Sequence, residues 1–466
     1  MSWGVPDLSQ IVKAYDIRGV VPDQLDAVVA EAVGAAFAAV TGAPTIAVGR
    51  DMRPSSPGLT GAFAAGVTRH GANVVDIGLA STDLLYFASG SLDVPGAMFT
   101  ASHNPARYNG IKLCRSGARP VGQDTGLGEI RRLAEEGPPP SASARGRVER
   151  RDLLPLYADR LKSLVDLAKI RRLKVIVDAG NGMAGHTVPA VFDGLPVDLV
   201  PLYFELDGNF PNHEANPIDP ANLVDLQRAV RAERADIGLA FDGDADRCWV
   251  VDERGESVPP SAIIALVAVR ELARKPGATI IHNLITSRAV PEIIREHGGQ
   301  PVRTRVGHSF IKAEMARTGA IFGGEHSAHY YFSDFWGADT GMLAALHVLA
   351  ALGEQPEPLS QLLARYTRYV ASGEINSTVG DQAGRLAAVR AAYDRNPGMT
   401  LDELDGLTAS TTSWWFNLRP SNTEPLLRLN AEATDAPTMQ AVRDDVLALI
   451  RDPGAAEQPH PAAGVS

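Results

Sequence analysis

A serine loop in the first quarter of the chain has the residue types of a phosphoryl carrier. Ser102 lies within Thr100–Pro105, after an apolar run and just before Asn104 and Pro105. Because the residue before a proline avoids the helical region, we expect the chain to turn here and to expose the Ser102 hydroxyl. Taken alone, such a serine is most often an ordinary turn residue.

A second loop, with three carboxylates, suggests a role for this serine. Asp242, Asp244 and Asp246 stand at alternate positions directly after the apolar run Ile237–Phe241. At the end of a buried strand these carboxylates can converge on one hard cation, and Mg²⁺ prefers a few carboxylates together with phosphate oxygens. A solvated acidic turn is the alternative interpretation. Arg247 favours the metal site, because a guanidinium beside the carboxylates can hold a phosphoryl group during transfer.

Two further polar loops offer groups that bind a sugar phosphate. Gly324–His329 combines a carboxylate, a hydroxyl and an imidazole, which suits a polyhydroxylated ligand, although His329 alone would more often be structural. Arg419–Pro425 places a cation, two hydroxyls and an amide in a tight turn, where backbone N–H groups can form an anion-binding nest; a capped turn is the alternative. A protein that moves a phosphoryl group within a sugar phosphate needs a covalent carrier, a metal, a hydroxyl clamp and a separate phosphate pocket. The four loops meet these four requirements.

The composition is that of a globular protein with no broad basic surface. The 466 residues are 45% hydrophobic and 21% charged, and the net charge of -11 makes nucleic acid or an anionic membrane an unexpected partner. Cys114 and Cys248 lie too far apart for a metal or redox motif. The first ten residues lack a signal pattern, and the longest apolar run, Ala262–Val269, is too short to cross a bilayer. We therefore expect a cytoplasmic protein.

Strands alternate with helices through most of the chain, which predicts an α/β protein with mixed, mainly parallel sheets. A Pro-, Ser- and Gly-rich run at Glu135–Gly146 marks a linker. We expect four domains and a tail: three related α/β/α domains and a smaller C-terminal α+β domain, followed by a disordered end. Their expected bounds are residues 1–147, 148–254, 255–368 and 369–455, with the tail at 456–466.

With these motifs in hand, the sequence resembles the α-D-phosphohexomutase family, and within it the bacterial phosphomannomutase/phosphoglucomutase group. The resemblance covers essentially the whole chain. It rests on six motifs in order: Tyr15–Gly19, Thr100–Pro105 with Asn109–Lys112, Asp242–Arg247, Gly307–Lys312, Gly324–His329 and Arg419–Pro425.

The resemblance implies a heart-shaped molecule whose fourth domain rotates to close over substrate. It also implies that Ser102 is carried as phosphoserine and that Mg²⁺ is held by its phosphate with Asp242, Asp244 and Asp246. The implied reaction interconverts hexose 1-phosphate and hexose 6-phosphate through a 1,6-bisphosphorylated hexose, which also serves as activator. The intermediate must turn end over end before the second transfer.

The resemblance also assigns roles to the other site residues. Arg247 and Lys112 offset the charge of the phosphoserine, and Lys112, His329 and Arg18 are three open candidates for proton transfer. Substrate contacts are expected from the first, third and fourth domains: Tyr15, His308, Glu325, Ser327, Arg419, Ser421, Asn422 and Thr423.

Two positions depart from the pattern of the group. Leu284 takes the place of a lysine that many relatives carry, which leaves Arg288 as the nearby cation that could reach the ligand instead. Ala245 stands where many relatives have glycine, and we expect metal binding to survive this change.

Mannose is the favoured substrate and glucose is also plausible. The Ser421-Asn422-Thr423 turn fits this group better than the glucosamine phosphate mutases, which usually carry Ser-Gly-Thr there. Other readings are a Mg²⁺-dependent sugar phosphatase, disfavoured by the separate phosphate pocket, and a non-catalytic sugar-phosphate sensor, disfavoured by the intact Ser102 and carboxylates. The expected oligomeric state is a monomer or a weak dimer.

Overall fold

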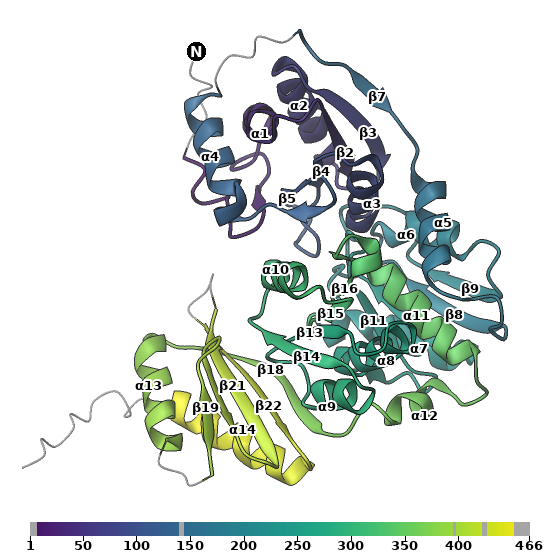
Figure 1. Ribbon diagram of the computed structural model, residues 1–466, viewed down its shortest axis with the longest axis vertical. Helices are drawn as coiled ribbons and strands as arrows, with labels where there is room; N and C mark the ends of the chain where they lie inside the picture. Colours follow the sequence, from purple (N-terminus) through teal and green to yellow (C-terminus); the bar gives the residue numbers. More distant parts are fainter. Residues whose placement is uncertain (1–6, 139–143, 395–397, 422–425, 452–466) are drawn as a thin grey trace, which may run out of the picture.

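The computed structural model describes residues 7–138, 144–394, 398–421 and 426–451. Four layered units follow one another along the chain, and the first and the fourth lie toward opposite ends of the molecule (Figure 1). The tail expected at residues 456–466 and the centre of the expected linker lie outside the described residues. Among the described helices, none is long and apolar enough to cross a membrane.

The first unit is a sheet with the strand order β1-β5-β4-β2-β3-β7, in which β6 also pairs with β5. The pairs β4–β2, β2–β3 and β3–β7 are parallel, and the others are antiparallel. Its strands are β1 Ile17–Val20, β2 Thr45–Arg50, β3 Asn73–Leu79, β4 Gly96–Phe99, β5 Tyr108–Arg115, β6 Arg119–Pro120 and β7 Val148–Arg150. Its helices are α1 Ala27–Thr41, α2 Ser56–Arg69, α3 Thr82–Leu92 and α4 Leu127–Glu136.

The second unit is a sheet of order β12-β11-β10-β8-β9. Its strands are β8 Leu173–Asp178, β9 Val197–Leu202, β10 Ile237–Phe241, β11 Cys248–Val251 and β12 Ser257–Val258. Its helices are α5 Leu154–Leu164, α6 Ala184–Phe192 and α7 Val224–Glu233.

The third unit has the order β14-β13-β15-β16-β17. Its strands are β13 Thr279–Asn283, β14 Gln300–Thr304, β15 Phe322–Gly324, β16 Tyr330–Phe332 and β17 Ala338–Asp339. Its helices are α8 Pro260–Arg274, α9 Ala289–Glu296, α10 His308–Thr318, α11 Gly341–Gly353 and α12 Leu359–Ala364.

The three units share one topology. In each, two parallel strands are followed in sequence by a third that pairs with the first of them, and then by two antiparallel strands that extend the sheet: β2 to β6, β8 to β12 and β13 to β17. The expected fold class, with three related α/β/α domains, is confirmed. The first sheet also includes β7, so it extends past the boundary expected at residue 147, because the chain returns along the sheet edge before it enters the second unit.

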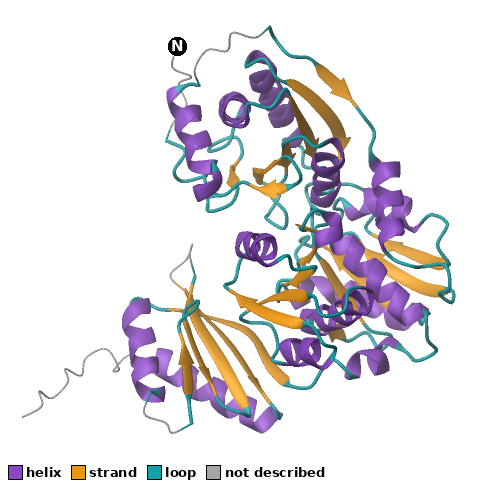
Figure 2. Ribbon diagram, in the orientation of Figure 1, coloured by secondary structure: helices purple, strands orange, loops and turns teal. Residues whose placement is uncertain are grey.

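The fourth unit is an antiparallel sheet of order β18-β22-β21-β20-β19. Two helices cover one face, and the other face is turned toward the third unit (Figure 2). Its elements are β18 Val370–Thr378, α13 Gln382–Tyr393, β19 Thr400–Asp402, β20 Leu407–Ser410, β21 Trp414–Pro420, β22 Leu426–Ala433 and α14 Ala436–Arg451. This unit has its own apolar core, while one continuous core joins the second and third units to part of the first.

Local sequence signals explain where several helices begin. The hydroxyl of Ser81 accepts a hydrogen bond from the Leu84 amide at the start of α3, and Thr340 caps α11 through the Leu343 amide in the same way. Both caps stand beside polar loops of the site described next. Because α3 and α11 begin at fixed positions, they can hold neighbouring loops in place.

Candidate active site

Three of the polar loops occupy the same place in the shared topology. The Ser102 loop joins β4 to β5, the Asp242–Arg247 loop joins β10 to β11, and the Glu325–His329 loop joins β15 to β16. Each loop has one residue in the left-handed region, with φ of 50° at Ser102, 59° at Ala245 and 63° at Ala328. The three sheets therefore present equivalent loops to one another.

The Ser102 hydroxyl lies against the metal loop. It donates to Asp242 Oδ2 at 2.7 Å, and it accepts from Arg247 Nη2 at 3.1 Å. Its oxygen also lies 3.1 Å from His103 Nδ1. These contacts leave Ser102 only 5% exposed, so the expectation of an exposed hydroxyl was wrong. A turn alone would expose the side chain, but two charged partners from the second domain cover it.

Arg53 shapes the serine loop and was missed in the sequence. Its fully buried guanidinium donates to the carbonyl oxygens of four loop residues, at 2.7 to 2.9 Å. These residues are Ser102, Asn104, Pro105 and Tyr108. Asp51 pairs with the same guanidinium at 3.2 Å. The charged residues that follow β2, Asp51 and Arg53, were the available signal. Nothing in the sequence showed that the Arg53 side chain points into the serine loop.

The two loops approach so closely that one position requires glycine. A Cβ on Gly243 would lie 2.4 Å from the Ser102 carbonyl oxygen. Real side chains do not come that close to a backbone oxygen, so any larger residue would push the carboxylates away from the serine.

The carboxylate trio has the donor set of a divalent cation site. Ligand oxygens of Asp242, Asp244 and Asp246 lie within 4.8 Å of one another. Oδ1 of Asp244 and Oδ1 of Asp246 are buried without a hydrogen-bond partner in the described chain. Buried carboxylate oxygens without partners are costly, so they fit a metal ligand role. The ammonium of Lys112 lies 2.7 Å from Asp244 and 2.6 Å from Asp246.

Burial and charge separate the pKa values of these groups. Burial raises the pKa of Asp242 to about 7, against the opposing effect of Arg247 and with help from the neighbouring carboxylates. Burial also acts to raise the pKa of Asp244, but Lys112 more than offsets it and holds this pKa well below the usual range. For Lys112, burial acts to lower the pKa, and the two carboxylates overcome it, so the pKa is raised and the amine stays charged.

A cavity of about 150 Å³ collects most of the predicted catalytic residues around the serine. Its lining comes from the first three units and includes Tyr15, Arg18, Ser102, Lys112, Arg247, His308 and His329. The rings of Tyr15 and His308 meet edge to face with centroids 4.8 Å apart. Burial, together with Lys112 and Lys312, lowers the pKa of His308 to about 3, so its ring is neutral.

His329 and Arg18 are held by polar neighbours inside this cavity. His329 Nδ1 lies 3.0 Å from Ser327 Oγ, and His329 Nε2 lies 3.8 Å from Asp246 Oδ1. Arg18 donates to Asp16 at 2.6 Å and to the Asn104 side chain at 2.5 Å. Both side chains therefore have fixed directions in the absence of substrate.

Glu325 is buried and holds the third-domain loops together. Its Oε1 accepts from the Gly307 amide at 3.0 Å and its Oε2 from the Tyr331 hydroxyl at 2.7 Å. The side chain is 2% exposed and does not line the cavity. The structure thus joins the loop that carries His308 to the loop that carries Ser327.

The sequence interpretation also missed an ion pair beside His329. The Lys312 ammonium lies 2.6 Å from Asp339 Oδ1 and 4.3 Å from the centre of the Tyr86 ring. Asp339 Oδ2 is 4.0 Å from His329 Nε2. Lys312 belongs to the Gly307–Lys312 motif, but its distance in sequence from Asp339 concealed the pair.

Arg419 and Ser421, two of the expected phosphate contacts, lie apart from this cavity. Arg419, on β21, is 6% exposed and pairs with Glu374 at 2.5 Å. The Ser421 amide donates to the Leu426 carbonyl at 2.8 Å. Asn422 and Thr423 lie outside the described residues, and neither Arg419 nor Ser421 lines the cavity around Ser102.

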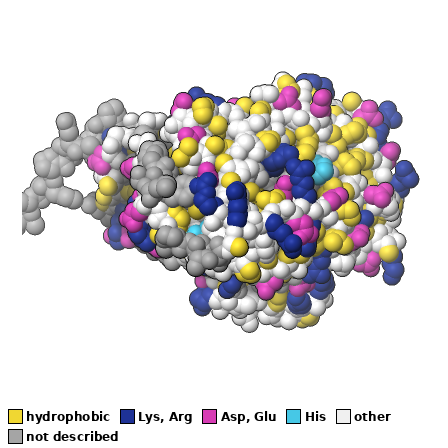
Figure 3. Space-filling model, turned by 90° about the horizontal axis from the view of Figure 1, so that it is seen from above, with side chains coloured by type: hydrophobic (Ala, Val, Ile, Leu, Met, Phe, Trp, Pro, Cys, Tyr) yellow, Lys and Arg dark blue, Asp and Glu magenta, His cyan; other side chains and the backbone are white. Residues whose placement is uncertain are grey.

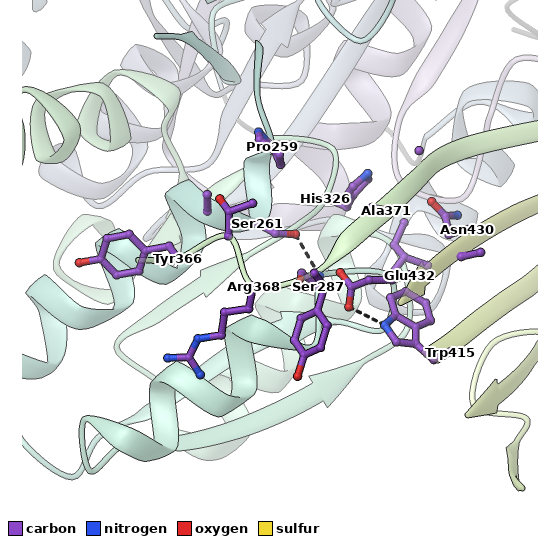
Figure 4. Close-up of a pocket in the computed structure, with 16 residues that line it drawn as sticks. Pro259, Ser261, Ser287, His326, Tyr366, Arg368, Ala371, Trp415, Asn430 and Glu432 are labelled. Carbon is purple, nitrogen blue, oxygen red and sulfur yellow. Dashed lines mark hydrogen bonds between the residues drawn. The ribbon is translucent and has the colours of Figure 1, made fainter. Parts of the chain in front are cut away.

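Arg288 contacts the fourth domain and does not line the cavity around Ser102. Its guanidinium donates to the carbonyl oxygens of Thr412 at 2.9 Å and Thr411 at 2.8 Å, both on the turn between β20 and β21. Its backbone amide donates to Glu432 Oε1 at 2.9 Å. Glu432 also accepts from the indole of Trp415 at 2.7 Å, a bond drawn in Figure 4. Arg288 therefore joins the third domain to the fourth.

The surface seen from above carries both signs of charge. Several Lys and Arg side chains gather around the middle of this face, with Asp and Glu among them, and a histidine lies to their right (Figure 3). This face is not uniformly basic.

Comparison with known proteins matches each unit to a family model in the expected order. Phosphoglucomutase/phosphomannomutase α/β/α domains I, II and III match residues 9–138, 155–255 and 259–369, and the C-terminal domain of that family matches residues 374–449.

Individual relatives cover nearly the whole chain. A phosphomannomutase of Escherichia coli is 42% identical over 450 residues, 94% of this chain and 98% of its own. A protein of Xanthomonas campestris named phosphohexose mutases is 40% identical over 448 residues, with the same coverage. The crystal structure of a phosphoglucomutase/phosphomannomutase family protein from Burkholderia thailandensis superposes with a TM-score of 0.86 at 34% identity, covering 95% of this chain and 98% of that one.

The fold, the serine and carboxylate loops and these matches define a phosphoryl-transfer enzyme of three repeated domains and a fourth. The chain belongs to the phosphoglucomutase/phosphomannomutase family. It is a phosphohexomutase, as the sequence predicted.

Proposed function

We propose that the enzyme interconverts mannose 1-phosphate and mannose 6-phosphate, and also accepts the glucose phosphates, by transfer through Ser102. The observation that carries this proposal is the position of the Ser102 hydroxyl, 2.7 Å from Asp242 and 3.1 Å from Arg247. A hydroxyl between a carboxylate trio and a guanidinium is placed to carry a phosphoryl group whose charge is offset on both sides.

Asp242, Asp244 and Asp246 would hold Mg²⁺ together with an oxygen of the phosphorylated serine. The fit rests on the two buried carboxylate oxygens without hydrogen-bond partners. The ion would neutralise phosphoryl oxygens as charge develops during transfer. Arg247 can do the same from the opposite side, because its guanidinium already points at Ser102 Oγ.

The transfer itself exchanges one P–O bond for another. A free sugar hydroxyl attacks the phosphorus of phosphoserine, the bond from phosphorus to Ser102 Oγ breaks, and a hexose 1,6-bisphosphate forms. The hydroxyl proton passes to a base, and Ser102 Oγ takes up a proton as it leaves. After the intermediate turns round, the same steps run in reverse with the other phosphate and regenerate phosphoserine.

We assign the proton-accepting role to His329. Lys112 is held as an ammonium by two carboxylates, and an arginine such as Arg18 keeps its protons in proteins. His329 lines the cavity beside Ser102, and Ser327 fixes its ring. Arg18 and Lys112 would then stabilise negative charge on the reacting oxygens.

The phosphate that is not reacting would bind Arg419, Ser421, Asn422 and Thr423, while Ser327, with Tyr15 and His308, contacts the sugar. Glu325 would need to exchange one of its present partners for a sugar hydroxyl. We also propose domain boundaries near residues 151, 255 and 369, and a cytoplasmic location, which suits two buried free cysteines.

The test measures formation of 6-phosphate from mannose 1-phosphate and from glucose 1-phosphate, with Mg²⁺ and a catalytic amount of hexose 1,6-bisphosphate, for the wild type and Ser102→Ala. Turnover that falls by at least about 10³-fold in the variant supports the phosphoserine route. The ratio of the two wild-type rates reports the sugar preference.

Intact-mass spectrometry supplies the control for the carrier. The wild type should gain one phosphoryl group after incubation with the bisphosphate, and Ser102→Ala should not. Equal turnover in both proteins, or free phosphate released in place of isomerised sugar, would contradict the proposal.

A further inference from the structure

A second cavity lies at the junction of the third and fourth domains and shares no lining residue with the cavity around Ser102. We call it the hinge pocket, because the chain passes along it from the third domain into β18. Its volume is about 150 Å³. Its walls are α8, the loop after β13, the connecting residues 366–373, and strands β21 and β22 (Figure 4).

The hinge pocket combines aromatic rings with uncharged polar groups. Trp415, Tyr366 and Tyr369 supply the aromatic surfaces. Ser261 accepts from the Ser287 amide at 3.0 Å, which leaves its hydroxyl proton for another partner. This lining differs from the arginines, lysine and carboxylates around Ser102.

The two charged residues of the hinge pocket already have partners. Arg368 pairs with Glu296 at 2.5 Å, outside the pocket. Glu432 accepts from the Trp415 indole and from the Arg288 amide. A charged ligand would therefore find no unpaired counterion here, and burying it would be costly.

Two polar groups in this pocket have no partner in the described chain. Asn430 is 5% exposed, and its Nδ2 makes no hydrogen bond. Nδ1 of His326 is likewise buried without a partner. Figure 4 shows both residues at the same end of the pocket, near Ala371. A buried donor or acceptor without a partner is unfavourable, so a ligand hydroxyl that reaches either atom would be stabilised there.

We propose that the hinge pocket binds the ring of a neutral, unphosphorylated monosaccharide. A cavity of 150 Å³ accepts one six-membered ring. The hydroxyls of a sugar can accept from Asn430 and pair with His326 Nδ1 and Ser261, while its C–H face lies on an aromatic ring. Sugar phosphates are disfavoured, because none of the described lining residues offers an unpaired cation to the phosphate.

Occupancy of the pocket couples to the motion of the fourth domain. Its walls come from both domains, with Ser261 and His326 on one side and Trp415 and Asn430 on the other. A bound ring would hold the two walls at one separation. On the proposed function, which needs the fourth domain to bring the phosphate loop toward Ser102, the sugar acts as an inhibitor that does not compete with sugar phosphate.

The binding test uses the full-length wild type with its catalytic cleft saturated by hexose 1,6-bisphosphate. Mannose, glucose and galactose are titrated separately, and binding is followed by calorimetry and by saturation-transfer NMR. We expect a dissociation constant on the order of millimolar for at least one sugar. Asn430→Leu keeps the side-chain size but removes the amide, and it should weaken binding about tenfold.

Asn376→Leu is the matched control. Asn376 lies on the neighbouring strand β18, is exposed and does not line the pocket, so this variant should bind sugar as the wild type does. Kinetics of the wild type with added free sugar should show a lower kcat/KM for sugar phosphate, and this effect should be lost in Asn430→Leu.

Three results would overturn the inference: no binding of any of the three sugars at about 100 mM, equal binding by Asn430→Leu and wild type, or displacement of the free sugar by the bisphosphate. Because binding is read without turnover, a failed mutase assay would not be mistaken for a failed hinge pocket. An Asn430→Leu protein that does not fold is replaced by Ser261→Ala, which should lower the affinity in the same direction.

Discussion

At the scale of single residues, the position of the reactive hydroxyl depends on a side chain that never touches it. Arg53 satisfies four backbone carbonyls of the serine loop, while Asp51 offsets its charge. Ser102 adopts a left-handed conformation at φ 50°, which is unfavourable for a residue with a side chain. The buried guanidinium offsets that cost by fixing the loop.

Arg53→Lys should therefore damage catalysis although the charge is kept. A lysine has one ammonium and cannot reach four carbonyls in the fork geometry of arginine. Leaving two buried carbonyls without partners would cost about 2–6 kcal/mol. We expect kcat to fall about 100-fold, with a lower melting temperature.

Steady-state kinetics and the extent of Ser102 phosphorylation by intact mass measure this effect. Arg50→Lys is the control, because Arg50 is half-buried on the same segment and its side chain makes no hydrogen bond within the described chain. An Arg53→Lys enzyme with wild-type kcat would show that the serine loop keeps its shape without the guanidinium of Arg53.

At the scale of elements, the three equivalent loops follow one construction. Each connects the third strand of its sheet to the antiparallel fourth, and each has a left-handed residue, with alanine at two of the three positions. This geometry explains why many relatives have glycine at the position of Ala245, because a glycine would be unstrained at this φ angle. A sequence shows such a substitution, but it does not show the φ angle that decides whether the alanine is strained.

Ala245→Gly should be tolerated and should stabilise the protein by up to about 1 kcal/mol, because it removes left-handed strain. Gly243→Ala, two residues earlier, should do the opposite. Its Cβ would meet the Ser102 carbonyl at 2.4 Å, so the metal loop must move and Mg²⁺ affinity should drop at least about tenfold. Thermal unfolding and Mg²⁺ titration of activity distinguish the two. Similar losses in both variants would contradict the loop geometry.

The first turn of α3 ties three domains together through one buried carboxyl. Asp83 accepts from Tyr157 at 2.6 Å and from Thr340 at 2.7 Å, which belong to the second and third domains. Burial raises the pKa of Asp83 to about 6, against the effect of its hydroxyl partners. The folded state therefore binds a proton more tightly than the unfolded chain does.

The sign of the pH dependence follows from this shift. Between about pH 4 and pH 6 the folded protein keeps the proton that the unfolded chain has lost, so wild-type stability falls as the pH rises through this window, by about 3 kcal/mol. Asp83→Asn lacks this dependence. The melting temperature of the wild type minus that of the variant should decline from pH 4 to pH 6 and then level off. A difference that is flat across this range would rule out the buried proton.

At the scale of the whole molecule, the fourth domain is attached through few contacts and has its own core. Arg288 is one of these contacts, and it donates to the turn between β20 and β21 and to Glu432. The contact helps to hold the third and fourth domains at their present angle, together with an ion pair between Arg303 and Asp402.

Arg288→Gln should loosen this angle without touching the chemistry. We expect KM for sugar phosphate to rise about 3- to 10-fold with kcat within about twofold of wild type, because a less fixed domain must be ordered on binding. Small-angle scattering should show a changed radius of gyration. Arg274→Gln, at an ion pair within the third domain, is the control. An unchanged KM and scattering curve would show that other contacts set the angle.

The sequence predicted some features of the fold and of the candidate site but not others. Alternating strands and helices predicted the three related domains, because buried parallel strands have a strong apolar signal, and the serine and carboxylate loops stood out because each follows such a strand. Short hairpin strands such as β16 and the helix α9 were missed, since a few residues carry little periodicity. Arg53, Lys312 and Asp339 were missed for another reason: their partners come from distant segments, and only the folded chain brings them together.

The position of Lys112 has a consequence for the protein in the absence of a metal ion. Its ammonium lies within 2.7 Å of two of the three carboxylates, so the acidic loop carries its own neutralising charge. With the proposed ion removed by a chelator, we therefore expect the protein to lose activity but to stay folded, and to regain activity when Mg²⁺ is added back.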